Sequence, residues 1–292
     1  MKTNNEWKDY KLLATSKGEK LEYFNGVTLL RPDPQVIWNN GEDLARNKDI
    51  CAIYKRSRTG GGAWEIKKKI PDNFYLHWRK LTFELKLMNF KHTGIFPEQA
   101  VNWERMIDII KNEKREINIL NLFGYTGGAT VACLSARARV CHVDAAKAMC
   151  DMAKRNCELS SVDMTKARFI VDDCIKFVEK EIRRGKKYDA VIMDPPSYGR
   201  GPKGETWKIE ESIFDLIKLT KGIISDNPVF YLINSYTTGL QPGVMKNLLQ
   251  IVFSDVPCEY VDADEIGIAG KDGLILPCGC SAFAKFEKNK KV

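Results

Sequence analysis

An alternation of strand-like and helix-like segments between residues 117 and 253 constrains the fold of this chain most strongly. Short apolar and β-branched runs, most of them ending at an acidic or glycine residue, are followed by longer runs with apolar residues at helical spacing. This alternation predicts a parallel sheet with helices on both faces, whose strands end on one common, ligand-binding edge. The predicted strands are 117–123, 139–144, 168–173, 188–194 and 228–236, and the predicted helices are 127–137, 145–160, 174–185, 205–223 and 242–253.

The rest of the chain shows a different pattern. Residues 1–75 contain short β-type runs separated by Pro, Gly and Asn, at 21–30, 51–56 and 62–68, which predicts a small antiparallel β region. A further strand is expected within 74–90, then a helix after Pro97, and the last segments are expected to close the sheet with a hairpin. We therefore predict a β-rich N-terminal domain (1–75) and a catalytic α/β domain (76–292) with a seven-stranded sheet.

Length and composition fit a soluble protein with a real core, because the 292 residues are 44% hydrophobic. No run reaches the roughly 18 consecutive apolar residues typical of a membrane-spanning helix, and the polar N-terminus lacks a signal peptide. We expect a cytoplasmic protein without a membrane partner. The net charge of +8, from 46 basic and 38 acidic residues, permits RNA binding without demanding it.

The nine cysteines do not form a metal-binding pattern. Cys278 and Cys280 are the only close pair, and they lack the second pair that a zinc site requires. His77, His92 and His142 are also scattered. We expect reduced thiols and no bound metal.

The turn after the first strand of the alternating region is rich in glycine. It reads NILNLFGYTGGATVA from residue 118, with Gly124, Gly127 and Gly128 at the junction between strand and helix. Glycine permits a tight turn and a close approach of the backbone to another group. A bound ligand and an ordinary structural turn both explain such a run, so its position on the ligand-binding edge is what favours the ligand.

Acidic residues close the next three strands on the same edge. Asp144, about 20 residues after the glycine turn, is placed to accept hydrogen bonds from both hydroxyls of a ribose. Asp173 is placed to bind an adenine amino group, or alternatively to cap the following helix. The fourth strand ends at Asp194, within the sequence Asp-Pro-Pro-Ser-Tyr. This order predicts a nucleoside site. The glycine spacing differs from that of dinucleotide-binding turns, and no phosphate-binding P-loop is present.

Four stretches now support a family resemblance: ILNLFGYTGGATVA, HVDAAKAMCDMAKRN, DDCIKFV and YDAVIMDPPSYGRG. Together they resemble the class I S-adenosylmethionine-dependent methyltransferases. More narrowly, residues 75–285 are similar to the family that includes the bacterial 23S rRNA cytosine-C5 methyltransferases. The resemblance implies a Rossmann-like sheet, S-adenosylmethionine as cofactor and RNA as substrate. The RNA-binding PUA domain of that family is not recognisable, and segment 1–75 is similar to the domain that links it to the catalytic fold.

The resemblance also implies roles for individual residues. The segment FKHTGIFPEQAVNW (90–103) would cover the cofactor, the glycine turn would hold its methionine part, Asp144 the ribose and Asp173 the adenine. The fourth strand end would lie where the methyl group leaves. The implied cofactor-binding residues are Thr93, Gly94, Phe96, Gln99, Asn121, Phe123, Gly124, Tyr125, Thr126, Gly127, Asp144, Asp173 and Asp194, and the implied catalytic residues are Asp194, Pro195 and Tyr198.

The acceptor atom stays open at this point. Cytosine C5 needs a cysteine thiolate that adds to the ring, and the Cys-Ser-Cys that the family carries after the fifth strand is here Asn234-Ser235-Tyr236. Cys278 and Cys280 are possible substitutes. An amine acceptor could instead be aligned by Asp194 and the Pro195 carbonyl while Tyr198 stacks on the base. Aminomethylases usually carry the aromatic residue directly after the second proline, where this chain has Ser197.

Two basic loops are candidates for contact with RNA, at 54–62 and at 199–208. The second contains Arg200, Lys203, Trp207 and Lys208. Solvated surface charge is the alternative for both loops. Three functions follow from the sequence: a methyltransferase acting on RNA, which the resemblance implies is ribosomal, a methyltransferase acting on a small molecule or protein, and a catalytically silent RNA-binding factor. Whether the protein is a monomer or a homodimer stays open.

Overall fold

The computed structural model describes residues 1–57, 61–88, 91–200 and 206–288. The chain divides into two compact units. The first contains residues 1–101 and 267–278, and the second contains 102–266 and 279–292. The predicted domain boundary between residues 75 and 76 falls inside a strand of the first unit, and the division into domains 1–75 and 76–292 stays a prediction.

The first unit is built around a five-stranded sheet in the order β2-β3-β4-β5-β6. Its strands are β2 (Tyr10–Ser16), β3 (Glu19–Phe24), β4 (Val27–Pro32), β5 (Ile50–Arg56) and β6 (Gly62–Ile66). β4 and β5 pair in parallel, so the expectation of a wholly antiparallel region was wrong. The long connection that a parallel pair requires is supplied by residues 33–49, which contain the 3-10 helix η1 (Leu44–Arg46).

The single β-run expected over residues 21–30 is two strands joined by a tight turn. Asn25 and Gly26 both have positive φ angles, of 43° and 92°, and Phe24 pairs with Val27 across them. An Asn-Gly pair between apolar runs is a strong hairpin signal, because both residues tolerate left-handed backbone angles. The unit also contains β1 (Lys2–Thr3), the hairpin β7 (Phe74–Trp78) and β8 (Leu81–Leu85), and the 3-10 helix η3 (Pro97–Gln99).

A buried ion pair lies in the sheet of the first unit. The Arg31 guanidinium donates two hydrogen bonds to the Glu22 carboxylate, at 2.7 and 2.8 Å, and the Tyr10 hydroxyl donates a third at 2.9 Å. The Arg31 side chain also donates to the carbonyl of Lys91 at 2.9 Å. The charges of Arg31 and Lys20 lower the pKa of Glu22 against the effect of its burial. The network therefore ties the segment that begins at Lys91 to the sheet.

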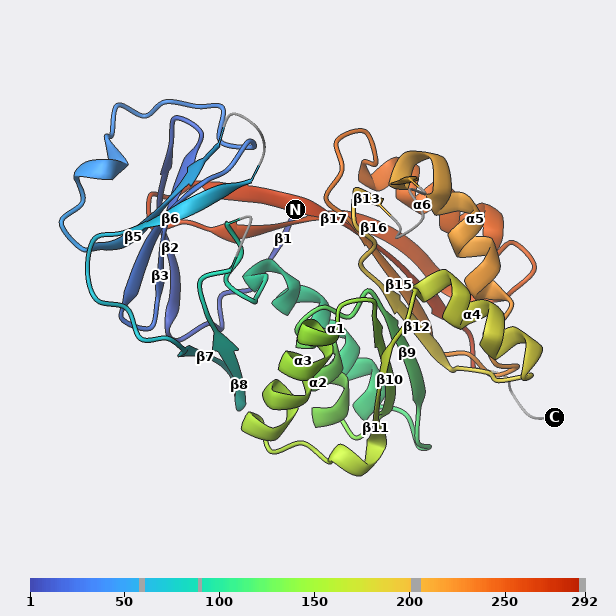
Figure 1. Cartoon of the computed structure of the whole chain (residues 1–292). Helices are drawn as coiled ribbons and strands as arrows, with labels where there is room; N and C mark the ends of the chain where they lie inside the picture. The colour runs from blue at the N-terminus through green and yellow to red at the C-terminus, as the bar shows by residue number, and fades with distance from the viewer. Residues whose placement is uncertain (58–60, 89–90, 201–205, 289–292) are drawn as a thin grey trace. The chain divides into compact units, whose positions relative to one another are not determined.

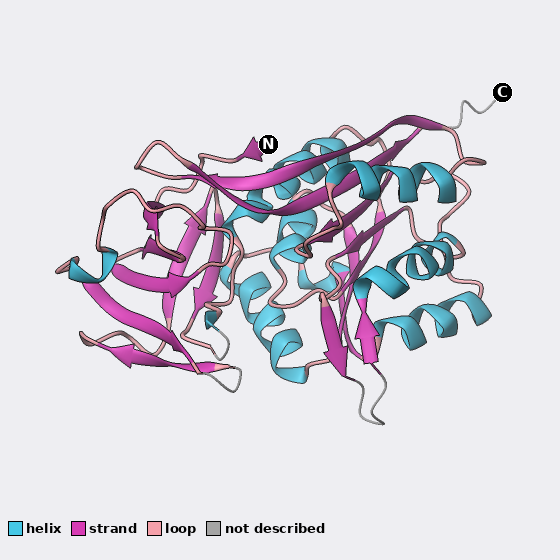
Figure 2. Ribbon diagram, turned by 90° about the horizontal axis from the view of Figure 1, so that it is seen from above, coloured by secondary structure: helices cyan, strands magenta, loops and turns pink. Residues whose placement is uncertain are grey.

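The second unit contains the predicted α/β sheet, and Figures 1 and 2 show helices on both of its faces. The full strand order is β1-β16-β17-β15-β12-β9-β10-β11, in which the two-residue β1, a segment of the first unit, adds to the predicted seven. Helices α1, α2 and α3 lie on one face, and α4, α5 and α6 lie on the other. The bounds are α1 (Ala100–Lys111), β9 (Asn118–Leu122), α2 (Gly128–Ser135), β10 (Arg139–Asp144), α3 (Lys147–Leu159), η4 (Met164–Lys166), β11 (Ala167–Val171), α4 (Cys174–Arg183), β12 (Ala190–Met193), β13 (Tyr198–Arg200), β14 (Thr206–Lys208), α5 (Ile209–Lys221), β15 (Phe230–Ser235), α6 (Pro242–Val252), β16 (Cys258–Ala269) and β17 (Ile275–Phe286).

The central parallel strands begin and end at nearly the same level of the sheet. Asn118 of β9 pairs with Arg139 of β10, and Val140 pairs with Ala167 of β11, in parallel. Alternate strand residues such as Leu120 and Leu122 are buried in an apolar core with residues of α4, α5 and α6. The carboxyl ends of β9, β10, β11 and β12 therefore share one edge of the sheet, as the sequence predicts.

One predicted helix begins later than expected. The helix predicted from residue 205 begins at Ile209, because residues 206–208 form β14, which pairs with β13 in a short antiparallel ribbon. The amphipathic pattern that predicts the helix is carried by Ile209, Ile213, Leu216 and Ile217, which are all buried. No helix in the described part of the chain has the length and apolarity needed to cross a membrane.

Candidate cofactor site

The turn between β9 and α2 has an unusual backbone. Phe123 and Tyr125 have positive φ angles of 55° and 50°, and Gly127 has one of 86°. Bulky residues rarely adopt this left-handed conformation, because each instance costs roughly 1–3 kcal/mol, which contacts with the surrounding structure must offset. Such backbone is concentrated at binding sites, which directs attention to this turn as the centre of the candidate site.

Hydrogen bonds hold the turn in this conformation. The amide of Gly124 donates to the carbonyl of Val143 at 3.0 Å, and the amide of Tyr125 donates to the Asp144 carboxylate at 2.8 Å. The side-chain amide of Asn156 donates to the Thr126 carbonyl at 2.8 Å. The turn is thus fixed by the end of β10 and by α3 rather than by its own residues alone.

The glycines of the turn clear space for the protein itself. A Cβ atom on Gly124 would lie 2.5 Å from Nδ1 of His142, one on Gly127 would lie 2.7 Å from Cβ of Ala153, and one on Gly128 would lie 2.5 Å from the Trp103 ring. This packing supports the structural explanation of the glycine run, and the explanation by a bound ligand stays a prediction. The glycines let the side chains of His142, Ala153 and Trp103 pack closely against the turn and the start of α2.

A chain of polar side chains lies beneath the turn. The buried Asn121 amide donates to the Thr130 hydroxyl at 2.9 Å, and this hydroxyl lies 2.9 Å from Nδ1 of His142. Burial lowers the pKa of His142 to about 4, with a backbone hydrogen bond at Tyr125 acting in the opposite direction. His142 is therefore neutral at pH 7. Asn121 uses its amide inside the protein, and its implied contact with a cofactor stays a prediction.

The Asp144 carboxylate ends β10 at the edge of the sheet and is partly exposed. One oxygen accepts from the amide of Tyr125 and the other accepts from the amide of Ala146, each at 2.8 Å. A carboxylate has about four lone-pair positions, so each oxygen keeps one for a further donor. Two vicinal hydroxyls of a ribose match these two acceptors, and the geometry fits the predicted role of Asp144.

The end of β11 carries two acids with different partners. Asp173 caps α4, because its carboxylate accepts from the amide of Lys176 at 2.9 Å. The capping alternative is therefore realised, although Asp173 is exposed and keeps acceptor capacity. Asp172 forms an ion pair with Lys180 at 2.5 Å. The implied contact of Asp173 with an adenine stays a prediction.

The loop after β12 is anchored by several contacts. The Trp207 indole donates to the Pro196 carbonyl at 2.6 Å, and the Thr237 hydroxyl donates to Ser197 at 2.6 Å. The ring of Trp207 also lies 6.3 Å from that of Phe123. Trp207 thus links this loop to the glycine turn, a structural role that the sequence did not predict.

Next to this anchored loop, Tyr198 is 52% exposed, so its ring is accessible on at least one side. Asp194 and Pro195 precede it at the carboxyl end of β12 and are less exposed. An accessible aromatic ring beside a partly buried carboxylate and carbonyl is what the in-line presentation of a planar acceptor would require. Lys203 lies outside the described residues, as do residues 58–60 of the basic loop at 54–62.

The end of β15 is polar but contains no thiol. The side-chain Oδ1 of Asn234 accepts from the side-chain amide of Asn102 at 3.0 Å and from the Ser281 hydroxyl at 2.8 Å, in a buried cluster. Cys280 pairs with Ser235 across β17 and β15, and burial raises its pKa to about 12. Burial also raises the pKa of Cys278 well above the ordinary value. Neither thiol is poised to ionise at neutral pH.

The segment that the resemblance assigns to covering the cofactor lies in the first unit. Thr93 and Gln99 are buried, and Gly94 has a φ of 100°. The Thr93 carbonyl accepts from the amide of Lys86 at 3.1 Å, and the ring of Phe96 lies 5.5 Å from that of His92. The segment is therefore well held, and its role toward a cofactor stays a prediction.

Within residues 1–57, 61–88, 91–200 and 206–288, no group of three or more His, Cys, Asp or Glu side chains is arranged to hold a metal ion. What the site offers instead is a strained turn, a carboxylate with two free acceptor positions, and a loop with an exposed aromatic ring. This combination can bind a nucleoside and present an acceptor to it.

Comparisons with known proteins agree with this site. The family model of S-adenosylmethionine-dependent methyltransferases matches residues 63–210. The ribosomal RNA large subunit methyltransferase I of Salmonella arizonae is 42% identical over 188 residues, which cover 64% of this chain and 44% of that protein. The Escherichia coli protein of the same name is 40% identical over 165 residues, covering 51% and 39%. This chain thus spans less than half the length of these curated relatives.

Solved structures show the same fold. The S-adenosylmethionine-dependent methyltransferase from Agrobacterium tumefaciens superposes with a TM-score of 0.89 at 29% identity, covering 97% of this chain and 92% of that one. The methyltransferase SMU.776, solved with S-adenosylhomocysteine, gives a TM-score of 0.75 at 19% identity, covering 97% and 76%. The second likeness concerns the fold alone.

Proposed function

Because this chain belongs to the family of S-adenosylmethionine-dependent methyltransferases, we propose that it methylates a base of ribosomal RNA. The family fixes the class of enzyme and the cofactor. The RNA substrate is our proposal, and the observation that carries it is the identity of 42% to a relative named for ribosomal RNA methylation. The exposed Tyr198 beside Asp194 supports a planar acceptor such as a base.

The residues at the carboxyl edge would hold the cofactor. Asp144 would accept hydrogen bonds from the ribose hydroxyls, and Asp173 would approach the adenine. Asn121 and the turn from Phe123 to Gly127, Thr126 included, would hold the methionine part. When bound, the sulfonium supplies an activated methyl group, and holding reactants in line can contribute up to roughly 7–11 kcal/mol. The segment with Thr93, Gly94, Phe96 and Gln99 stays our candidate for covering the site.

The acceptor atom that we favour is a ring or exocyclic nitrogen. Carbon-5 of cytosine requires a thiolate, whereas the raised pKa values of Cys278 and Cys280 keep both thiols protonated. Asp194 and the Pro195 carbonyl would align an amine, with Tyr198 stacking on the base. This route needs no metal. It uses only the groups at the end of β12, next to the cofactor residues at the ends of β9 and β10.

A transfer assay with tritium-labelled S-adenosylmethionine tests the proposal. Purified ribosomal RNA is incubated with the protein, digested to nucleosides and separated. We expect label in one modified nucleoside, carried on nitrogen. Label on carbon-5 would overturn the nitrogen assignment, and label only in a protein or a small acceptor would overturn the RNA substrate. We also propose a cytoplasmic location, where ribosomal RNA is found, and a monomer or homodimer that light scattering can distinguish.

A second function, that of a catalytically silent RNA-binding factor, predicts a different result. Such a factor would bind RNA but bind S-adenosylmethionine weakly or not at all. The two free acceptor positions of Asp144 favour a working cofactor site. Calorimetry with S-adenosylmethionine separates the two functions directly.

A further inference from the structure

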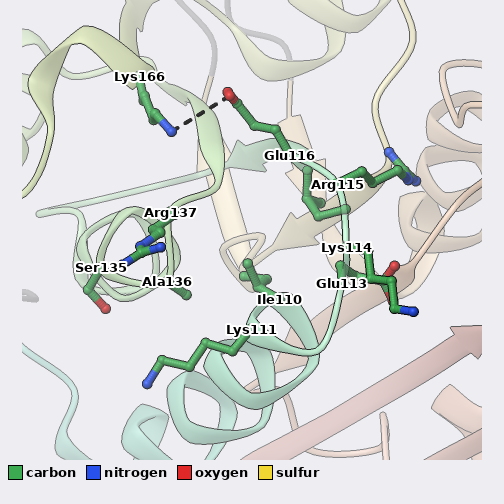
Figure 3. Close-up of a pocket in the computed structure, with 11 residues that line it drawn as sticks. Ile110, Lys111, Glu113, Lys114, Arg115, Glu116, Ser135, Ala136, Arg137 and Lys166 are labelled. Carbon is green, nitrogen blue, oxygen red and sulfur yellow. Dashed lines mark ion pairs between the residues drawn. The ribbon is translucent and has the colours of Figure 1, made fainter.

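The amino edge of the second unit's sheet, opposite the carboxyl edge, carries two cavities. The first has a volume of about 540 Å³ and lies between the end of α1 and the end of α2, as Figure 3 shows. The second has a volume of about 280 Å³ and lies beside the starts of β10 and β11. Both are lined by Lys166, so they are neighbours on one surface.

Basic side chains dominate the lining of both cavities. Nine cations line them against three acids, Glu113, Glu116 and Glu181. We call these nine cations the basic edge: Lys111, Lys114, Arg115, Arg137, Arg139, Lys166, Arg168, Lys186 and Lys187.

The topology explains why these residues are gathered. The four adjacent strands β12, β9, β10 and β11 all run in the same direction, so the segments that lead into them share the amino edge. Each segment brings cations: 111–115 before β9, 137–139 into β10, 166–168 into β11 and 186–187 before β12. Residues far apart in the sequence therefore form one continuous positive surface.

Several of these cations are not explained by protein contacts. Arg115 pairs with Asp189 at 2.9 Å, Arg139 pairs with Glu116 at 2.7 Å, and Lys187 donates to a carbonyl. Lys166 points toward Glu116 at 3.7 Å (Figure 3). In the described part of the chain, the remaining five form no ion pair, and all are exposed: Lys111, Lys114, Arg137, Arg168 and Lys186.

We propose that the basic edge binds the phosphate backbone of the RNA substrate at a distance from the site of methyl transfer. Unpaired cations spread along an exposed edge suit a repeating chain of phosphates better than one small anion. The strands separate the two edges by about 17–20 Å, so an RNA held at both must fold around the unit. The inference rests on the proposed RNA substrate.

Stabilisation of helix ends is an alternative explanation for some of these cations, and it must be distinguished from RNA binding. Lys111 ends α1 and Arg137 follows α2, where a positive charge stabilises the carboxyl end of a helix. Lys114 and Arg168 are not at helix ends, because they lie in a loop and in β11. A variant should therefore include these two, and its stability must be measured with its binding.

The test uses the triple variant Lys114→Gln, Arg137→Gln and Arg168→Gln in the full chain. Its matched control is Lys218→Gln, Lys246→Gln and Lys285→Gln, which removes the same charge from residues that line neither cavity. The affinity for purified ribosomal RNA is measured from about 50 to about 200 mM salt, with calorimetry of S-adenosylmethionine and thermal melting alongside.

In the triple variant, we expect the slope of log affinity against log salt concentration to decrease in magnitude by about 2–3. The affinity for RNA near physiological salt should be about 10- to 100-fold weaker. For methyl transfer, KM for RNA should rise while kcat and cofactor affinity stay unchanged. The control should keep the slope of the wild-type protein. An unchanged slope in the triple variant, or an equal loss in both variants, would overturn the inference. A lower melting temperature without a change of slope would assign the cations to helix stabilisation and overturn it too.

Failure of the proposed function is recognised separately. If the wild-type protein transfers no methyl group to RNA, the RNA substrate is wrong, while the salt titration still decides whether the basic edge binds RNA. If the wild-type protein methylates RNA but the triple variant keeps its slope and KM, only the inference fails.

Discussion

The His142 ring lies directly under Gly124, so that a Cβ atom on the glycine would be 2.5 Å from Nδ1 of the imidazole. Gly124 lies in the turn that follows β9, and His142 lies within the neighbouring strand β10. The ring is buried and held by Thr130, so it has little room to move. The shape of the candidate site therefore depends on a contact inside the protein.

Replacing Gly124 by alanine should destabilise the protein, because the methyl group would overlap this fixed ring. We expect a loss of about 1–3 kcal/mol in the free energy of unfolding, together with weaker binding of S-adenosylmethionine. Urea denaturation and calorimetry measure the two effects. The control is Gly243→Ala in α6, where a Cβ atom meets nothing within 4 Å. Equal stability of the two variants would contradict the overlap.

Replacing Asp144 by alanine should abolish binding of S-adenosylmethionine and loosen the turn. The carboxylate accepts from the amides of Tyr125 and Ala146, and each lost bond to a charged group is worth about 1.5–3 kcal/mol. Calorimetry gives the affinity and circular dichroism the fold. Asp172→Asn, at the end of the adjacent strand, is the matched control. Unchanged affinity in Asp144→Ala would refute the ribose contact.

Stability should fall as the pH is lowered from about 6.5 to about 4. Burial lowers the pKa of both His92 and His142 from 6.5 to about 4, so the unfolded state binds more protons across this interval. For each histidine we expect a loss of about 2 kcal/mol between pH 7 and pH 5. Urea denaturation at these two values measures it. The variant His142→Gln should lose about half of this pH dependence, and an unaltered dependence would contradict its buried neutral state.

Removing both thiols near the end of the chain should leave activity intact. Burial raises the pKa of Cys280 to about 12 and that of Cys278 well above its ordinary value, so neither supplies a thiolate at pH 7. The double variant Cys278→Ala and Cys280→Ala is assayed for transfer of tritiated methyl groups to RNA. We expect kcat within about twofold of wild type, since neither thiol takes part in the transfer and alanine is a small apolar replacement for each. An inactive but folded variant would restore the thiolate route.

The sequence predicts the α/β architecture well because local patterns carry it. The strands ending near Leu122 and Asp144 and the helices around Val131 and Phe177 form where the apolar periodicity places them. The match to solved methyltransferases confirms the fold class. The predicted β-run over residues 21–30 is wrong at its centre, where Asn25 and Gly26 form a turn. An Asn-Gly pair is typical of hairpins, so this turn could be predicted from the sequence.

What could not be predicted depends on contacts between distant residues. No local pattern shows that Gly124 needs space because of His142, or that Trp207 binds the Pro196 carbonyl. The basic edge was not predicted for the same reason, since its cations are divided among four segments that only the sheet topology brings together. The individual roles of the cofactor-binding residues stay predictions, because they concern a ligand and not the fold.

The strands β16 and β17 make one long hairpin whose tip, residues 267–278, belongs to the first compact unit while its arms belong to the second. The tip is bonded there: Thr15 donates to the Asp272 carboxylate, and the amide of Lys271 donates to Leu12. The polypeptide thus crosses between the units three times. Cutting the backbone near residue 101 would leave the units joined by two covalent connections. A single truncation there could not yield either unit whole, because the hairpin tip would stay with the second unit's residues and be missing from the first.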